Sequence, residues 1–370
     1  MIRGDQPGEG DVPAWTVAGL GRFLIAPDAG EQLAPVGEQG MRGPGALVLD
    51  LDASSPEDLE RWGPGLLEQL PILPCVTIAL SSPDASSRSA AHHALRDACD
   101  VVLASSEALP ALLAGFAETP LSALAFVQLL RGSEGRSVYA GLVAESFVYS
   151  TLQSGAEFRR WLEARRSRGS RWLRRVREGR KEAQACRMER DRDRLEIHLT
   201  RAHKHNAFSR AMRDGLSEAL QLALADPTIE ELVLSGEGDS FCSGGDLDEF
   251  GSFPDPAEAH VIRTTRSPAL LLWRLRDRVR VDVHGACIGA GAELPAFAGA
   301  VVAREDAFFA LPEVGLGLVP GAGGSASLPR RIGRQRTAWL GLSGARIDAR
   351  TALDWGLVDE VRLGQHVGRE

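Results

Sequence analysis

Cysteine is scarce in this chain and is not clustered. The five cysteines among 370 residues are scattered and form no C-x-x-C pair, which argues against both a disulfide framework and a zinc site. Positive charge is not in excess either: 42 Lys and Arg stand against 50 Asp and Glu, a formal net charge of −8. A general nucleic-acid-binding domain usually has the opposite balance. We therefore expect a cytoplasmic protein with no nucleic-acid partner and no bound metal.

Long apolar runs are also missing. No uninterrupted run reaches the roughly 18 residues of a membrane span. The first residues, MIRGDQPGEGDVPAW, lack the charged and apolar regions of a signal peptide. The chain has 44% hydrophobic residues, enough for packed cores, and its length suits about two domains of roughly 150 residues each. The expected molecule is globular and has no membrane partner.

The N-terminal half divides into a lead-in and an α/β domain. Residues 1–44 are rich in Gly, Pro, Asp and Glu, a composition typical of a poorly ordered or loosely docked segment. Residues 45–185 alternate in pattern: β-branched runs at 46–51, 74–80 and 100–105 predict strands, and 55–70 and 86–99 predict helices with serine caps. Such alternation implies parallel strands with helical crossovers.

This domain ends in a helical linker that is strongly basic. Fifteen Arg and Lys residues lie between Arg159 and Arg194, interleaved with Trp161 and Trp172. A charge run on a linker helix is usually a solvated face, and we prefer that interpretation. Contact with the phosphates of a bound nucleotide is the alternative.

Residues 190–370 show a second series of alternating elements. Strands are predicted at 194–201, 231–236, 279–286 and 300–305, and helices at 209–226, 257–277 and 290–300. The strand, helix and strand of 74–105 follow the same order as those of 279–305. The N-terminal domain is therefore either a degenerate copy of the second half or an α/β unit that shares only the pattern.

Two bends in the second half are built from small residues. The first is FCSGGD, with Gly244 and Gly245, and the second is HGACIGAGAEL, where Gly289, Ala290 and Gly291 lead into a helix. Unpaired N–H groups at such a point carry partial positive charge and suit an anion. If the N–H groups of Gly245 and Ala290 converge, they form an oxyanion hole for a carbonyl oxygen. Otherwise both stretches are only tight turns.

Two glutamates lie in unusually apolar surroundings. Glu293 follows Gly289 by one helical turn among alanines and leucine, and Glu313 lies between AFFALP and VGLGLVPGAGG. Acidic residues are rarely buried without a partner. Each alone is explained by a structural ion pair or cap. Beside an oxyanion hole, however, they suit proton transfer next to an activated carbonyl group.

Four motifs together resemble one enzyme family. FCSGGDL, HGACIGAGAEL, FFALPEVGLGLVPGAGGSASLPRRIG and GARIDARTALDWGLVDEV occur in this order, and the chain from about 194 to 361 is similar to the crotonase superfamily of enoyl-CoA hydratases and isomerases. The resemblance implies a ββα spiral in residues 190–370. It also implies an acyl-CoA thioester as substrate, with coenzyme A as part of that substrate and no separate cofactor.

The resemblance assigns roles to individual residues. It implies that Gly245 and Ala290 supply the oxyanion N–H groups and that Glu293 and Glu313 are the catalytic acids. RAHKHNAFS resembles the first loop of the family that contacts coenzyme A. The residues expected to contact the coenzyme A portion are Lys204, Ala207, Gly244, Asp246 and Gly289. Asp246 and Asp248 are also predicted to cap a helix after the first bend.

The chain departs from the family pattern at three points. Ala290 stands where the family has a glycine, which is harmless if only its N–H is needed. The sequence stops at Glu370, so we expect the catalytic domain to lack the C-terminal helices that close the site and build oligomers in the family. The third departure is the N-terminal half, which an ordinary hydratase lacks. We expect its residues 45–185 to cover the surface that the missing helices would occupy, and we still expect a homo-oligomer.

Three functions fit these features. The first is hydration of the 2,3 double bond of an enoyl-CoA, a lyase reaction, because both glutamates are present. The second is another crotonase-type reaction, either isomerisation or the oxidation of an acyl-CoA by O₂ without a cofactor. The additional N-terminal half keeps this second function open, since it could be a helical domain like that of the dihydroxyphenylacetyl-CoA dioxygenases. The third is a catalytically silent subunit that binds coenzyme A.

Overall fold

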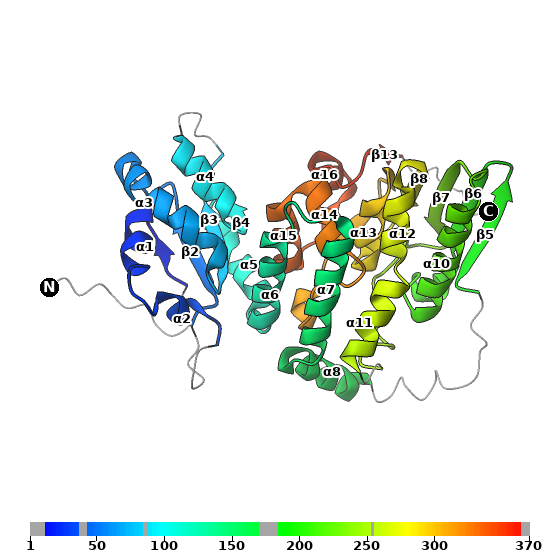
Figure 1. Ribbon diagram of the computed structural model, residues 1–370, viewed down its shortest axis with the longest axis horizontal. Coiled ribbons are helices and arrows are strands. Elements are labelled where there is room, and N and C mark those ends of the chain that lie inside the picture. Colours follow the sequence, from blue (N-terminus) through cyan, green and yellow to red (C-terminus); the bar gives the residue numbers. More distant parts are fainter. Residues whose placement is uncertain (1–11, 37–42, 84–87, 170–183, 253–254, 364–370) are drawn as a thin grey trace.

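The protein consists of two sheet-containing units with a layer of helices between them. The computed structural model describes residues 12–36, 43–83, 88–169, 184–252 and 255–363. The N-terminal unit lies at one end of the elongated molecule, the four helices that follow it lie in the middle, and the second unit lies at the other end (Figure 1).

The N-terminal unit is a parallel four-stranded sheet in the order β1-β2-β3-β4. Its strands are β1 (Ala14–Trp15), β2 (Ala46–Asp50), β3 (Val76–Leu80) and β4 (Val101–Leu103). The helices beside it are α1 (Val17–Phe23), α2 (Ala29–Leu33), α3 (Pro56–Gln69) and α4 (Ala90–Ala98). Ser55 and Ser89 cap α3 and α4 through their side chains, so the predicted strands, helices and caps of this unit are confirmed.

Part of the expected lead-in belongs to this unit. Strand β1 pairs with β2, and the side chains of Val17, Leu20 and Leu33 are buried in the same core as Leu47. The prediction of a poorly ordered segment was therefore wrong for residues 14–33. Composition misled because a few well-spaced apolar residues suffice to dock a short segment on an existing sheet.

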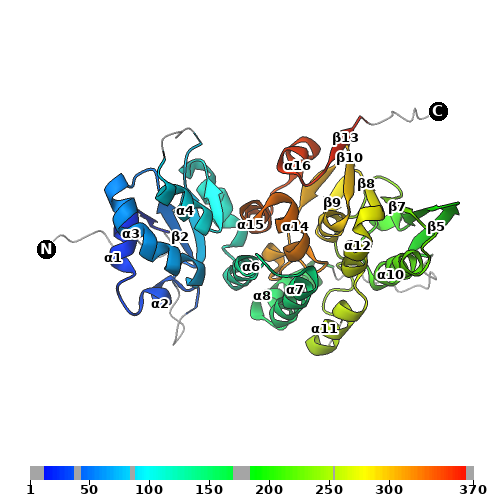
Figure 2. The same ribbon diagram turned by 45° about the horizontal axis from the view of Figure 1, so that its top comes forward.

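The four middle helices connect the two units. They are α5 (Leu109–Phe116), α6 (Pro120–Arg131), α7 (Val138–Gln153) and α8 (Ala156–Gly169). Helices α5 and α6 pack against α15, and α7 packs against α11 and α14 of the second unit (Figure 2). Phe116 and Phe126 share one apolar core with Val314 and Leu342. This helical layer is thus part of the second unit's packing and not a free linker.

The second unit contains two sheets. Five parallel strands and the antiparallel β5 form the larger sheet, in the order β13-β10-β8-β7-β6-β5, and the smaller sheet has the order β12-β11-β9. The strands are β5 (Cys186–Asp191), β6 (Arg194–Leu199), β7 (Glu231–Gly236), β8 (Val279–Val283), β9 (Ala286–Ile288), β10 (Ala300–Arg304), β11 (Phe308–Ala310), β12 (Ile347–Asp348) and β13 (Glu360–Arg362). The helices are α10 (Arg210–Ala225), α11 (Pro256–Thr265), α12 (Pro268–Leu275), α13 (Ala290–Glu293), α14 (Gly324–Ile332), α15 (Arg334–Ser343) and α16 (Ala349–Trp355).

Two predicted helices of this unit differ from those observed. The stretch 257–277 forms α11 and α12, because Pro268 cannot donate a backbone hydrogen bond within a continuous helix and Ser267 caps the second one. The stretch 290–300 gives only the four-residue α13 and a 3₁₀ turn at Pro295–Phe297, with Pro295 at the break.

The suggested duplication is not visible in the topology. The described part of residues 12–169 has one sheet and no counterpart of the smaller sheet β12-β11-β9. No single helix in the described ranges is long and apolar enough to cross a membrane, and only the pair 106–116 and 120–131, bent by 110°, passes that test jointly.

Candidate active site

Backbone hydrogen bonds join the two glycine-rich bends directly. The N–H of Cys242 donates to the carbonyl oxygen of Ala286 at 3.0 Å, and the N–H of Ile288 donates to the carbonyl oxygen of Cys242 at 3.0 Å. This short parallel bridge holds the first bend beside the end of β9. The bridge between Cys242 and Cys287 therefore brings together two segments that are distant in sequence.

The two amides expected to form an oxyanion hole line one cavity. Within the described chain, neither the N–H of Gly245 nor that of Ala290 donates a hydrogen bond. Both residues line a cavity of about 190 Å³, together with Glu293 and Glu313. The four residues assigned to catalysis from the sequence are thus brought together, with two free donors and two acids facing the same space.

Neighbouring groups explain why these bends require glycine. Gly244 and Gly289 have positive φ angles of 95° and 51°, which side chains rarely adopt. A Cβ on Gly245 would lie 2.7 Å from the ring of Phe250, and one on Gly289 would collide with the carboxylate of Glu313. The immediate effect of glycine at 244 and 245 is to admit the Ile288 carbonyl and the Phe250 ring.

Glu293 is fixed in place by two backbone donors. Its side chain lies in α13 and is 1% exposed. Its Oε2 accepts hydrogen bonds from the N–H of Ala322 at 2.7 Å and of Gly324 at 2.8 Å. Burial first, and then the charge of the nearby Glu313, raise the pKa of Glu293 well above its usual range. The bend before α14 therefore sets the orientation of this carboxyl group.

Glu313 is held less tightly. It follows β11 and lines the cavity, and its Oε2 is buried yet accepts no hydrogen bond from the described residues. Burial raises the pKa of this carboxyl group to about 7. A carboxyl group with this pKa and a free oxygen can both release and take up a proton near neutral pH.

A third buried glutamate comes from the helical layer. Glu145 in α7 accepts hydrogen bonds at Oε1 from the N–H of Gly323 (2.7 Å) and at Oε2 from the N–H (2.8 Å) and Oγ (2.6 Å) of Ser325. Burial raises its pKa to about 7. These donors alternate along the chain with Ala322 and Gly324, which donate to Glu293. Glu145 and Glu293 therefore both accept hydrogen bonds from the same bend.

Sequence analysis missed Glu145. The signal was present, since this acid lies in the apolar stretch GLVAESFVY, the same kind of setting that identified Glu293. Its contacts span 178 residues of sequence, and no local pattern predicts such a pairing.

Two helices that are distant in sequence also contribute to the wall of the cavity. Tyr149 and Gln153 of α7 line it, as do Ala259, Ile262 and Arg263 of α11. Helix α7 packs closely on the second unit, because a Cβ on its Gly141 would lie 3.1 Å from that of Ala326 in α14. This helix and its neighbours thus pack on the second unit, and the expectation that they cover the surface of the family's C-terminal helices stays a prediction.

The second half of the chain is similar in sequence to known proteins. A family model described as enoyl-CoA hydratase/isomerase matches residues 191–369. The chain belongs to the enoyl-CoA hydratase/isomerase family. It is 36% identical over 171 residues to the 2,3-dehydroadipyl-CoA hydratase of Escherichia coli and 35% identical over 172 residues to the 1,2-epoxyphenylacetyl-CoA isomerase of the same organism, in each case over 45% of this chain and 65% of the relative.

The match to this crotonase family is confined to half of the chain. The enoyl-CoA hydratase structure from Thermoplasma volcanium has 33% identity, a TM-score of 0.46, and coverage of 49% of this chain and 73% of that one. The chain spans just under two thirds of the length of the curated relatives named above. The relatives include hydratases and isomerases, and the crotonase fold and an acyl-CoA reaction are what they have in common.

The loop expected to contact coenzyme A is tied to the first bend by ion pairs. Lys204 Nζ lies 3.0 Å from Asp248 Oδ2 and 3.2 Å from Asp246 Oδ2, and Arg201 lies 2.8 Å from Asp246. Asp246 lines the cavity, whereas Lys204 and Ala207 do not. The predicted helix cap at Asp246 and Asp248 was wrong, because residues 247–251 form turns and these carboxylates are engaged by cations.

The basic linker is only partly described. In α8, Arg165 lies 3.2 Å from Asp248, and Trp161 stacks on Phe158 with ring centroids 5.8 Å apart. Trp172 and the arginines of 170–183 lie outside the described residues. For α8, the observed packing of Trp161 and the pairing of Arg165 agree with a helix that has one packed side.

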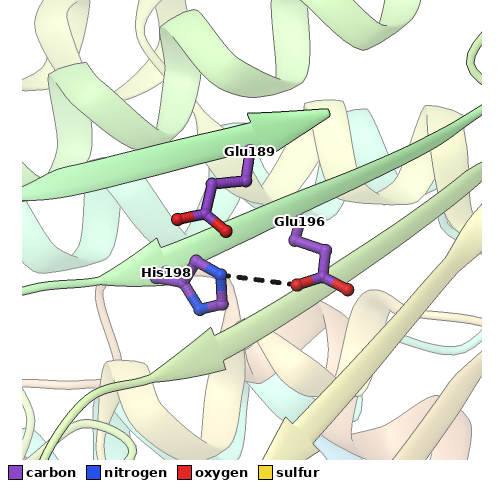
Figure 3. Close-up of side chains that lie close together, drawn as sticks. All are labelled: Glu189, Glu196 and His198. Carbon is purple, nitrogen blue, oxygen red and sulfur yellow. Dashed lines mark ion pairs between the residues drawn. The ribbon is translucent and has the colours of Figure 1, made fainter. Parts of the chain in front are cut away.

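A cluster of Glu189, Glu196 and His198 lies on the edge strand β5 and its neighbour β6, and the side chains approach one another there (Figure 3). Each carboxylate already has a cation: Arg187 contacts Glu189, and Arg194 lies 2.8 Å from Glu196. Their charge is therefore compensated within the protein, and none of the three residues lines the cavity.

Proposed function

We propose that the protein is a hydratase that adds water across the 2,3 double bond of an enoyl-CoA thioester. The observation that supports this proposal is the shared cavity, which is lined by the two residues with unpaired amides and by the two glutamates. The amides suit the thioester oxygen, and the glutamates suit the two proton movements that hydration requires.

In the proposed reaction, the protein groups act on the thioester oxygen, the attacking water and the α-carbon. The N–H groups of Gly245 and Ala290 bind the thioester oxygen as negative charge develops on it. Glu293, held by its two backbone donors, orients a water molecule and accepts a proton from it as its oxygen bonds to the β-carbon. Glu313 gives a proton to the α-carbon. Water is thus added in full without net oxidation or reduction, so the reaction needs no redox cofactor.

The pair of acids favours hydration over isomerisation. Moving a double bond takes a proton from one carbon and returns one to another, which a single carboxyl group can do. Activation of water at the β-carbon and protonation at the α-carbon occur at two positions and use both Glu293 and Glu313. The two acids differ accordingly, since one is held by two N–H groups and the other has a free oxygen.

The test is turnover of crotonyl-CoA by the purified full chain, followed as loss of the absorbance of the conjugated thioester. We expect Glu293→Gln and Glu313→Gln each to lower kcat by about a hundredfold or more, the range typical of lost general acid–base catalysis. Glu305→Gln is the matched control, because Glu305 is exposed in the same unit. Turnover of a 3-enoyl-CoA isomer without any hydration would contradict the proposal.

A further inference from the structure

The part of the cavity away from the bends contains an arginine with unused hydrogen-bonding capacity. Arg263 of α11 lines both the main cavity and a smaller one that continues from it. The two cavities share Phe208, Arg213, Gly321 and Ala322 as walls. A ligand extending from the amides toward α11 would therefore meet Arg263.

The protein holds the guanidinium group of Arg263 in a fixed orientation. Nε donates to Oγ of Ser146 at 3.0 Å, and Nη2 donates to the carbonyl oxygen of Ser146 at 3.3 Å and to Oγ of Ser150. The guanidinium carbon lies 4.7 Å from the ring centroid of Tyr149. Three neutral acceptors and one aromatic face hold the cation, all of them from α7.

No acidic side chain neutralises this cation directly. Among the described residues no carboxylate lies within 4 Å of Arg263, and its Nη1 donates to none of them. The neighbouring arginines are different, since Arg213 and Arg266 both pair with Asp214, at 2.8 and 3.1 Å. Glu145 attracts Arg263 at longer range, but its oxygens are occupied by Gly323 and Ser325.

We propose that Arg263 recognises a carboxylate at the far end of the acyl group, so that the preferred substrate is the coenzyme A thioester of an unsaturated dicarboxylic acid. Nη1 of Arg263 has no acceptor among the described residues, and a guanidinium cation with an unused donor nitrogen suits a carboxylate. A purely aliphatic tail would leave this half-buried cation with neutral partners only, which is less favourable than pairing with an anion. This inference rests on the proposed function for the position of the thioester.

The first experiment uses binding alone, so that it does not depend on turnover. Affinities of the full chain for two saturated ligands of equal length, adipyl-CoA and hexanoyl-CoA, are compared by isothermal titration calorimetry. We expect adipyl-CoA to bind about tenfold more tightly or better, the effect of one charged hydrogen-bonded pair. Equal or tighter binding of hexanoyl-CoA overturns the proposal, whether or not the protein hydrates any enoyl-CoA.

The second experiment assigns the preference to Arg263. The Arg263→Gln variant should reduce the preference for adipyl-CoA about tenfold or more, and 2,3-dehydroadipyl-CoA should lose the same factor in kcat/KM relative to 2-hexenoyl-CoA. Arg274→Gln is the matched control, because Arg274 is exposed on α12. If Arg263→Gln keeps the preference, the assignment is wrong. If Arg263→Gln does not fold, Arg263→Lys is tested in its place. That variant retains the charge but not the planar guanidinium group.

Discussion

Replacing Glu313 by glutamine should lower kcat about a hundredfold or more and at the same time stabilise the protein at alkaline pH. Its carboxyl group has a buried oxygen without a described hydrogen bond, so the ionised form gains little from its surroundings. Burial raises its pKa from 4.5 to about 7. A buried carboxyl group of this kind reduces stability in the pH range where it is ionised.

The direction in which pH changes the free energy of unfolding depends on whether the folded or the unfolded state binds the Glu313 proton. Between pH 4.5 and about 7 the folded state holds the Glu313 proton while the unfolded state has lost it, so the free energy of unfolding falls as pH rises through this range. Above pH 7 the full difference of about 2.5 pKa units corresponds to about 3 kcal/mol. The glutamine amide also lacks partners, so we expect a net gain of about 1 to 3 kcal/mol at pH 8.

The assay is urea unfolding of the full chain at pH 8 and pH 4.5, followed by tryptophan fluorescence. Trp339 and Trp355 report on the second unit, where their rings pack edge to face. Glu313→Gln should unfold at higher urea than the wild type at pH 8 and show little advantage at pH 4.5, whereas the exposed Glu305→Gln should match the wild type at both. An advantage at pH 4.5 as large as that at pH 8 would refute the electrostatic reasoning.

Two further substitutions test the surroundings of the acids. Gly289→Ala forces a side chain to a φ of 51° and against the Glu313 carboxylate, so kcat for crotonyl-CoA should fall about tenfold or more; unchanged kcat would mean that Glu313 can move aside without loss. Glu145→Ala releases three donors in the bend that holds Glu293, so kcat should fall about tenfold to a hundredfold with a smaller change in KM. The exposed Glu163→Ala in α8 is the control, and a change confined to KM would place Glu145 in substrate binding.

Local patterns predicted the elements that depend on neighbouring residues. Serine caps at Ser55 and Ser89 begin helices as expected, because a cap acts within three residues of its own position. Strand β5 was missed, since only Cys186 faces a core and the other five residues of that strand are exposed. An edge strand of this kind has no apolar alternation to detect.

The site was predictable only where the motifs themselves are contiguous. Gly245 lies in the first bend, Ala290 and Glu293 lie in the second, and Glu313 lies in a further contiguous motif, so all four could be named from sequence. Glu145 and Arg263 could not, because each gains its place only when α7 packs against α11 and α14. Such contacts depend on three-dimensional packing and not on spacing along the chain.

Three buried carboxyl groups close to one another make the ionisation of each less favourable. The pKa values of Glu145, Glu293 and Glu313 are all raised, by burial first and, for Glu293 and Glu313, by the charge of neighbouring carboxylates. Full ionisation at neutral pH is therefore unfavourable, and the site retains at least one proton. The proposed hydration, in which one acid gives a proton to carbon and another takes one from water, requires such a mixture of protonated and ionised acids. By adding a third acid, helix α7 raises the pKa of both Glu293 and Glu313 and so helps to keep that proton in place.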